Sequence, residues 1–461
     1  MIALALVGCT PDSTSDSDVP VELVDPFVRA PVHTYGMTDV SSDLLAVLEN
    51  GTLRGSCDRY RDAPDDLGLR RRCGKEQFFY ETFDTVGVPR PIVSFLLEEL
   101  GDLVGPGFSA YGLIADPTSP AGVPLGMAPS ADDSIAFTCA SCHFGRLPDG
   151  RYAVGAPNQD YDYGAHNLSM TLVPMSLLGS DGIDPEAAAD VQPLLDALDA
   201  SPALRVQLGL ALLPLAGTPA PEFPLDVQRL YARWVPGTMD FAIAPLPLDD
   251  GVHTISRIPP LWRLPTLDER DAAGMDHAML GWTGNTPSTE DFVYWFGVLG
   301  GGRHPTPEDI GPITAYLESL EAPEPPVPSG DPRGLELFAQ HCGACHSGPS
   351  GSGLTVYPLD EIGTDPAIGL WMDPTGSGAP CCNAELPADF VTGAIKSPRL
   401  VGLWAQQRFL HNGSVGSIEA LLCVEPREGV VEPAFGDAGH EYGCELDLAD
   451  REILVEWLAT H

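Results

Sequence analysis

Two copies of the pentapeptide Cys-x-x-Cys-His, at 139–143 and 342–346, constrain this chain more than any other feature of its sequence. Two thiols on one short turn can form thioether bonds to the vinyl groups of a haem, and the adjacent imidazole then binds the iron from one face of the ring. The spacing is the attachment signature of c-type haem and predicts two covalently bound haem c groups. The expected attachment residues are Cys139, Cys142, Cys342 and Cys345, and the expected proximal ligands are His143 and His346.

The other cysteines indicate an oxidising compartment. The chain has eleven cysteines, and six remain once Cys9 and the four haem cysteines are set aside. These six are Cys57, Cys73, Cys381, Cys382, Cys423 and Cys444. An even remainder suits disulfides. Cys57 with Cys73 would close a local loop, and Cys423 with Cys444 would staple the segment that carries His440, but sequence alone does not fix the pairing. A Cys/His zinc site is the alternative use of the two motifs, although a zinc ribbon normally has a second cysteine pair nearby.

The beginning of the chain resembles a lipoprotein signal. Residues 6–9, Leu-Val-Gly-Cys, fit the lipobox pattern, in which Cys9 would be diacylated and followed by a polar tether to about residue 25. The basic region of a secretory signal is missing and the apolar run is short, so we expect an upstream start codon. No later stretch approaches the ~20 apolar residues of a membrane span, which leaves acyl chains as the expected anchor. We therefore expect a periplasmic or outer-membrane location. A free N-terminal cysteine on a cytoplasmic protein is the alternative.

A strong negative charge limits the partners. The formal net charge is −41, which argues against nucleic acid and anionic membrane surfaces as partners. A basic redox partner would be attracted, but we favour the simpler explanation of a solvated acidic surface with no specific partner.

The expected fold is mainly α, with two cytochrome c-like haem domains, long loop-rich segments and little β structure. Glycine and proline, at 49 and 46 residues, imply many turns. Helical periodicity is visible at 92–103, 186–213 with a break near residues 201–202, 225–234, 308–320, 331–341 and 446–460. A proline-rich run at 321–328 cannot continue a helix and marks the main boundary. The expected parts are a tether at 1–25, an N-terminal haem domain at 26–325 and a C-terminal cytochrome c-like domain at 326–461.

Several segments between about residue 130 and the C-terminus carry a family resemblance. Residues 395–404 and 409–414 resemble the bacterial dihaem cytochrome c peroxidase superfamily, which also contains the enzymes that mature tryptophan tryptophylquinone. Its rubber-oxygenase-like branch is the most similar, on the segments 259–262, 281–285, 362–366 and 439–443.

For the second haem, the resemblance bears on the ligand opposite His346. The peroxidases usually place a methionine there, and Met372 is the only methionine after His346. His440 and His411 are the other candidates. The Gly-His-Glu-Tyr-Gly setting of His440 is similar to the distal histidine of the rubber-oxygenase branch, so we favour His440. His411 would then hydrogen-bond a haem propionate or the backbone.

For the first haem, the resemblance favours an open iron position opposite His143, because an enzyme that activates peroxide or dioxygen needs one. His166, His253 and His277 are the candidates for an occupied position. An aromatic group would either wall this pocket or belong to the ordinary core. Its members are Trp282, Tyr294, Trp295 and Phe296.

The resemblance implies an exported dihaem oxidoreductase, with hydrogen peroxide reduced at the His143 haem and electrons relayed through the His346 haem. Trp282 joins His143 as a candidate catalytic residue. The alternatives are a dihaem oxygenase or substrate-oxidising enzyme, and a dihaem electron-transfer protein without catalysis. The expected partners are a small redox protein or quinol-linked donor and a small-molecule oxidant, and relatives of this kind often form homodimers.

Overall fold

The computed structural model describes most of the chain after residue 35. The described ranges are 36–119, 122–177, 182–217, 223–240, 255–268, 280–327, 330–347, 349–352, 356–366, 368, 393–430 and 434–461. Helices predominate in these ranges and the strands are short, which confirms a mainly α fold with small sheets. None of the described helices combines the length and apolar character needed to cross a bilayer. Cys9 and the expected tether lie outside these ranges.

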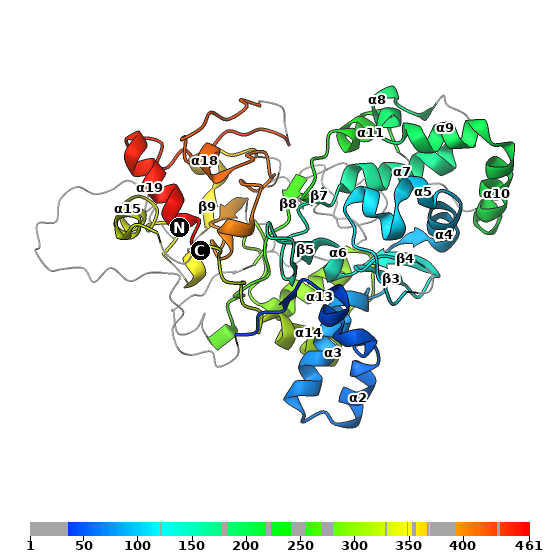
Figure 1. The fold of residues 1–461 in the computed structure, drawn as a ribbon, viewed down its shortest axis with the longest axis horizontal. Helices are drawn as coiled ribbons and strands as arrows, with labels where there is room; N and C mark the ends of the chain where they lie inside the picture. The colour runs from blue at the N-terminus through cyan, green and yellow to red at the C-terminus, as the bar shows by residue number, and fades with distance from the viewer. Residues whose placement is uncertain are drawn as a thin grey trace, which may run out of the picture.

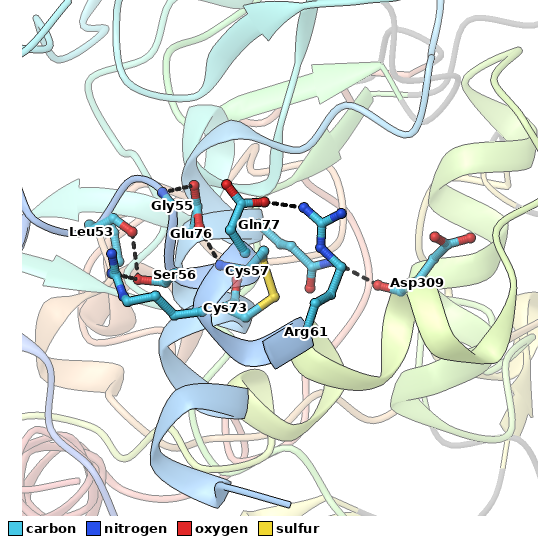
Figure 2. The surroundings of a disulfide bond; sticks show 11 residues. Leu53, Gly55, Ser56, Cys57, Arg61, Cys73, Glu76, Gln77 and Asp309 are labelled. Carbon is cyan, nitrogen blue, oxygen red and sulfur yellow. Dashed lines mark hydrogen bonds and ion pairs between the residues drawn. A yellow bond between two sulfur atoms is a disulfide. The ribbon is translucent and has the colours of Figure 1, made fainter. Parts of the chain in front are cut away.

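One N-terminal helix packs against a helix more than 200 residues away in sequence. The N-terminal helices are α1 (Leu44–Val47), α2 (Ser56–Asp62) and α3 (Leu67–Tyr80). Helix α3 contacts α2 and packs against α14 (Pro307–Leu317), which also contacts α13 (Thr289–Leu299). At the crossing of α3 and α14, Gly74 is needed because a Cβ there would lie 2.1 Å from the carbonyl oxygen of Pro312. The Cys57–Cys73 disulfide joins α2 to α3, so this expected pairing is confirmed (Figure 2).

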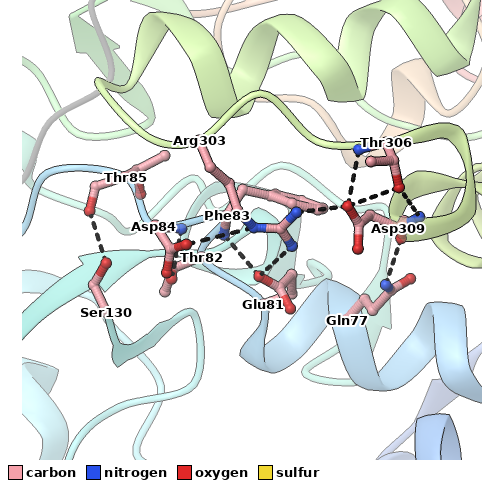
Figure 3. A network of polar contacts seen from close by, with 10 residues as sticks. All are labelled: Gln77, Glu81, Thr82, Phe83, Asp84, Thr85, Ser130, Arg303, Thr306 and Asp309. Atoms are coloured by element: carbon pink, nitrogen blue, oxygen red, sulfur yellow. Dashed lines mark hydrogen bonds and ion pairs between the residues drawn. The ribbon is translucent and has the colours of Figure 1, made fainter. Parts of the chain in front are cut away.

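A charged network closes the same region (Figure 3). Arg303, just before α14, forms ion pairs with Asp309 at 2.6 Å, Asp84 at 3.5 Å and Glu81 at 3.7 Å. Burial raises the pKa of Glu81, against the opposing effect of the Phe83 backbone and Arg303. The network therefore ties the end of α3 to the start of α14.

Small antiparallel sheets lie on either side of the first Cys-x-x-Cys-His motif. Two of the described sheets have three strands, in the order β2 (Val88–Pro89), β4 (Ser134–Phe137), β3 (Met127–Pro129) and in the order β1 (Val40–Ser41), β6 (Tyr152–Val154), β5 (Phe144–Arg146). The other two described sheets are pairs, β7 (Thr238–Asp240) with β8 (Ile255–Arg257) and β9 (Val356–Pro358) with β10 (Ala394–Lys396). Because β4 ends just before the first motif and β5 begins just after it, two sheets fix both ends of the motif.

A separate helical group covers a second buried core. Its helices are α4 (Arg90–Glu99), α5 (Gly101–Val104), α7 (Tyr163–Met175), α8 (Pro185–Asp190), α9 (Gln192–Ala200), α10 (Pro202–Leu212) and α11 (Leu225–Ala232). Figure 1 shows these helices on the side of the molecule opposite α19. The expected break near residue 201 is present, because Ser201 caps α10 by accepting the backbone N–H of Leu204.

The C-terminal part begins and ends with packed helices. These are α15 (Pro332–His341) and α19 (Leu448–Leu458), with α16 (Leu359–Ile362) and α18 (Ile418–Leu421) between them. The rings of Phe338 on α15 and Trp457 on α19 lie 5.1 Å apart. Gly334 lies directly against Trp457, which lets the two helices approach closely. Both helices were expected from the sequence and both are present. Buried residues from either side of the expected boundary near residue 325 share one core, and the boundary stays a prediction.

Candidate functional site

The first Cys-x-x-Cys-His motif forms a single helical turn, α6 (Cys139–His143). Thr138 precedes it and donates its hydroxyl hydrogen bond to the carbonyls of Phe78 and Phe79, each at 3.1 Å. The backbone N–H of Asn158 donates to the carbonyl of Cys142 at 2.7 Å. Neither cysteine of the turn forms a disulfide. Both thiols and the imidazole therefore lie on one fixed turn, as haem attachment requires.

His143 borders a largely apolar cavity. Desolvation lowers the pKa of His143 to about 4, with the nearby carbonyl of Pro259 acting in the opposite direction and the charge of Arg399 acting in the same direction. Nδ1 of His143 lacks a hydrogen bond of normal geometry, although it faces that carbonyl. A neutral imidazole beside an apolar space is the form that binds a metal ion.

The predicted aromatic residues divide at this cavity. Trp282, Trp295 and Phe296 line it, together with Leu261 and Leu280 among others. Tyr294 does not line it, because its hydroxyl bonds Nδ1 of His304 at 2.7 Å. Three of the four residues therefore line the cavity, and the fourth, Tyr294, is directed towards His304. Whether any of them walls a haem pocket stays a prediction.

The second motif follows α15 as a tight turn. The N–H of Cys342 donates to the carbonyl of Phe338 at 2.8 Å, and the N–H of His346 donates to the carbonyl of Cys342 at 2.9 Å. Nδ1 of His346 is 2.8 Å from the carbonyl oxygen of Gly351, with the carbonyl of Pro398 also close. A hydrogen bond at Nδ1 fixes the ring and leaves Nε2 for a metal ion.

His440 faces His346 across the second cavity. The two ring centroids are 6.4 Å apart, and both residues line the same cavity as Cys342 and Cys345. Imidazoles bound to opposite faces of one iron have centroids about 6 Å apart, because each metal–nitrogen bond is about 2 Å and each ring adds about 1 Å. Nδ1 of His440 has no hydrogen-bond partner among the described residues. The pair therefore fits an iron held between two histidines.

His411 lines the same cavity in a different setting. Its Nδ1 is 3.1 Å from the hydroxyl of Thr364, and its ring lies 6.5 Å from that of Trp282. Burial lowers its pKa to about 4, and the charge of Arg257 acts in the same direction. This geometry suits a residue that contacts the edge of a bound group.

The loop that carries His440 is held from several directions. The Cys423–Cys444 disulfide, the second pairing expected from the sequence, is present. The guanidinium of Arg427 donates hydrogen bonds to a ring of backbone carbonyls, those of Ala420, Leu421, Asp437, Gly439 and His440. A Cβ on Gly439 would lie 2.6 Å from the backbone of Gly363, so the segments 362–366 and 439–443 pack directly on each other.

One wall is common to both cavities. The residues that line both are Arg257, Trp282, Lys396, Pro398 and Arg399. The indole N–H of Trp282 donates to the carbonyl of Arg257 at 3.1 Å, and the N–H of Lys396 donates to the carbonyl of Trp282 at 2.8 Å. The wall therefore joins segments that are far apart in sequence.

The shared wall contains two buried, positively charged guanidinium groups, those of Arg257 and Arg399. Arg257 donates to the carbonyl of Leu410 and to the side-chain oxygen of Gln406, and Arg399 donates to the carbonyl of Pro260. These acceptors are neutral. Burial lowers the pKa of each of the two guanidinium groups to about 10, which leaves both charged at neutral pH. Buried cations favour anionic groups nearby, and haem propionates are such anions.

Of the other histidine candidates only His166 belongs to the described residues, and it is not brought to the first cavity. His166 does not line it and is packed among aromatic rings in the second core. His253 and His277 lie outside the described residues, as do Met372, Cys381 and Cys382. No cluster of three or more His, Cys, Asp or Glu side chains forms in the described ranges, so the structure adds no support for the zinc alternative.

Sequence reasoning missed the two prolines whose carbonyls face the motif histidines. Pro259 faces His143 and Pro398 faces His346. A cation stands two residues before each proline, Arg257 in one case and Lys396 in the other. This short repeat, basic residue, any residue, proline, was the signal that could have found both the prolines and the shared wall.

Comparisons with known proteins add no relative. No family model matches the chain, and no curated protein matches it.

Proposed function

We propose that this chain is an exported dihaem c-type oxidoreductase of the dihaem cytochrome c peroxidase kind, in which two cytochrome c-like domains each hold one haem. Its reaction is the reduction of hydrogen peroxide at the His143 site, with electrons supplied through the His346 site. The observation that carries the proposal is the unequal surroundings of the two motif histidines. His346 faces the imidazole of His440, whereas the cavity beside His143 is lined by no second histidine among the described residues.

This difference supports separate roles for the two sites, electron transfer at one and reaction with the oxidant at the other. Two strong ligands saturate an iron and suit it to electron transfer, while a single protein ligand leaves room for a small oxidant. When bound, haem supplies one-electron exchange at the first kind of site and cleavage of the peroxide O–O bond at the second. Cys139, Cys142 and His143 would hold the first haem. The second haem would be held by Cys342, Cys345, His346 and His440.

The chain itself supplies position, charge and exclusion of water. The apolar lining contributed by Leu261, Leu280 and Phe296 keeps bulk water from the His143 site. Asp240 and Asn285 bring polar groups to the same cavity, where peroxide reduction consumes protons. Arg257 and Arg399 supply the positive charge that the propionates of both groups require. Trp282 lies in the wall between the two cavities and is placed to pass electrons between them.

The surroundings of the protein follow from the same proposal. The donor is a small redox protein or a quinol-linked partner, and the net charge of −41 favours a basic docking surface on it. The location is the periplasm or the outer membrane, with the acylated Cys9 as anchor. Fractionation of a Cys9→Ala variant tests that anchor, because loss of the acyl chains should release the protein from the membrane.

Optical and electron paramagnetic resonance spectra of the oxidised, haem-loaded protein test the proposed function. We expect one high-spin and one low-spin iron, and we expect peroxide to change the high-spin signal first. The matched variants remove one attachment site each, with Cys139 and Cys142 changed to Ala in one and Cys342 and Cys345 in the other. Only the first variant should lose the high-spin signal. Two low-spin irons that ignore peroxide would instead identify an electron carrier.

The apolar lining of the His143 cavity also favours a second candidate function. Leucine and aromatic side chains suit the binding of an organic substrate, whereas a cavity that binds only hydrogen peroxide does not need them. Consumption of dioxygen with an unsaturated hydrocarbon, without added peroxide, would identify the protein as an oxygenase.

A further inference from the structure

A buried tyrosine and histidine form a pair beside the first haem motif. The hydroxyl oxygen of Tyr161 is 2.9 Å from Nδ1 of His166, and both side chains are fully buried. Tyr161 and Cys142 belong to the same buried cluster, and the Cys142 thiol lies near enough to act electrostatically on the Tyr161 hydroxyl. The pair is therefore next to the point where the haem would be attached.

Aromatic side chains surround the imidazole of His166. Four aromatic rings enclose its imidazole, with centroids at 5.2 Å for Phe108, 5.6 Å for Tyr111, 5.8 Å for Tyr161 and 6.2 Å for Phe137. These largely apolar surroundings keep the resting imidazole neutral, so that its lone pair is free to accept a proton. Nε2 of His166 has no hydrogen-bond partner among the described residues. An ordinary core pair needs neither the aromatic cage nor the open nitrogen.

We propose that Tyr161 is an oxidisable residue of the His143 site, which gives up one electron to the oxidant there while its phenolic proton passes to Nδ1 of His166. This inference rests on the proposed function, which supplies hydrogen peroxide as the oxidant. Peroxide takes two electrons and two solvent protons to become two waters. One electron comes from Tyr161 and the other from the electron donor. A later electron from the donor reduces the tyrosyl radical, and the proton returns from His166.

The geometry allows the phenolic proton of Tyr161 to pass directly to His166. A proton acceptor must lie within about 2.6–3.2 Å of the proton donor's heavy atom, and Nδ1 of His166 does. Burial lowers the pKa of His166 to about 3, so the imidazole is neutral in the resting protein and its lone pair can accept the proton. Burial also raises the pKa of Tyr161 well above its usual value, so the phenol keeps its proton until it is oxidised.

The test is rapid freeze-quench electron paramagnetic resonance of the haem-loaded protein after mixing with hydrogen peroxide. We expect a tyrosyl signal that narrows when ring-deuterated tyrosine is incorporated. Tyr161→Phe should abolish this signal. Tyr111→Phe is the matched control, because Tyr111 also contacts the His166 ring but pairs its hydroxyl with Ser169. A signal that survives Tyr161→Phe overturns the proposal.

The role of His166 needs its own variant. His166→Leu keeps the Tyr161 hydroxyl but removes the proton acceptor, so the tyrosyl signal should be largely lost. In the unchanged protein, radical formation should be slower in D₂O than in H₂O, because a proton moves with the electron. An unaltered radical yield in His166→Leu would show that the proton goes elsewhere and would refute the pairing.

A photochemical arm separates this inference from the proposed function. A flash-oxidised ruthenium tris-bipyridine complex supplies a one-electron oxidant without peroxide. If peroxide leaves the haem spectra unchanged but the flash produces a radical that depends on Tyr161 and His166, the peroxidase proposal fails and this inference stands. If the haems react with peroxide and neither oxidant gives a radical dependent on Tyr161, this inference is wrong.

Discussion

His440 adopts a backbone conformation that few residues other than glycine tolerate. Its φ is +49°, in the left-handed region, where a residue with a side chain is strained by about 1 kcal/mol. Such a conformation persists only where the surroundings hold it. Here the N–H of His440 donates to the carbonyl of Ile362 at 3.0 Å, and its own carbonyl accepts from Arg427. The conformation presents the imidazole to His346 at the spacing that an iron would need.

We expect His440→Ala to convert the second iron from low-spin to high-spin and to raise its reduction potential, because a strong ligand is removed. His411→Ala is the comparison. It should leave the spin state unchanged and alter the potential only modestly, since His411 is held by Thr364 at the edge of the cavity. Electron paramagnetic resonance of the two oxidised variants decides between them. A low-spin signal that survives His440→Ala but vanishes in His411→Ala would reverse the assignment.

The segment from Cys423 to Cys444 acts as a structural unit, and its described residues form no helix or strand. A disulfide closes its ends, and Arg427 organises its described backbone through the carbonyls it binds. The carboxylate of Asp437 also accepts a hydrogen bond from the backbone N–H of Gly429 at 2.7 Å. One arginine thus replaces the hydrogen bonds that a helix or sheet would provide, because a guanidinium has five donors in a fixed plane.

Arg427→Lys should therefore loosen the loop although the charge is kept. Lysine has three donors on a flexible stem and cannot reach the same set of carbonyls. We expect a loss of about 2 kcal/mol in stability and a mixture of low-spin and high-spin iron at the second site. Arg61→Lys is the matched control, since the Arg61 side chain is 74% exposed and pairs with Asp58 on the surface. An unchanged low-spin signal in Arg427→Lys would show that the disulfide alone positions His440.

At the scale of the whole molecule, the cavities beside the two motifs share a wall, which is built by segments that are far apart in sequence. Arg399 donates to the carbonyl of Pro260 at 2.7 Å, and the N–H of Arg257 donates to the carbonyl of His411 at 2.6 Å. The guanidinium of Arg257 lies 4.9 Å from the ring of Trp282. The segments 259–262 and 281–285 both contact the segment 395–404 here, so the wall joins the linings of the two cavities.

Trp282→Phe should slow electron exchange between the two sites while leaving both attachments and both spin states intact. Phenylalanine keeps an apolar ring in the wall but is harder to oxidise and lacks the N–H that bonds Arg257. Trp295→Phe is the control, because Trp295 lines only the His143 cavity of the two. Stopped-flow mixing of the half-reduced protein with peroxide measures the exchange rate. Equal rates in the two variants would remove Trp282 from the electron path.

The sequence by itself determined the local features of this protein. The turns of the two Cys-x-x-Cys-His motifs and the first and last helices of the C-terminal part depend on residues close in sequence, so spacing and periodicity were enough to predict them. The two observed disulfides join residues at most 21 positions apart and were expected as pairs, but the sequence left the pairing open and the structure decided it. Only the tertiary structure decided which distant segments meet. The packing of α3 on α14, the common wall of Arg257, Trp282 and Arg399, and the aromatic cage of His166 depend on buried surfaces matching in shape and charge. The helix and strand propensities of a segment do not indicate which distant surface it will contact, because the same residues form the same turns and helices whichever surface that is.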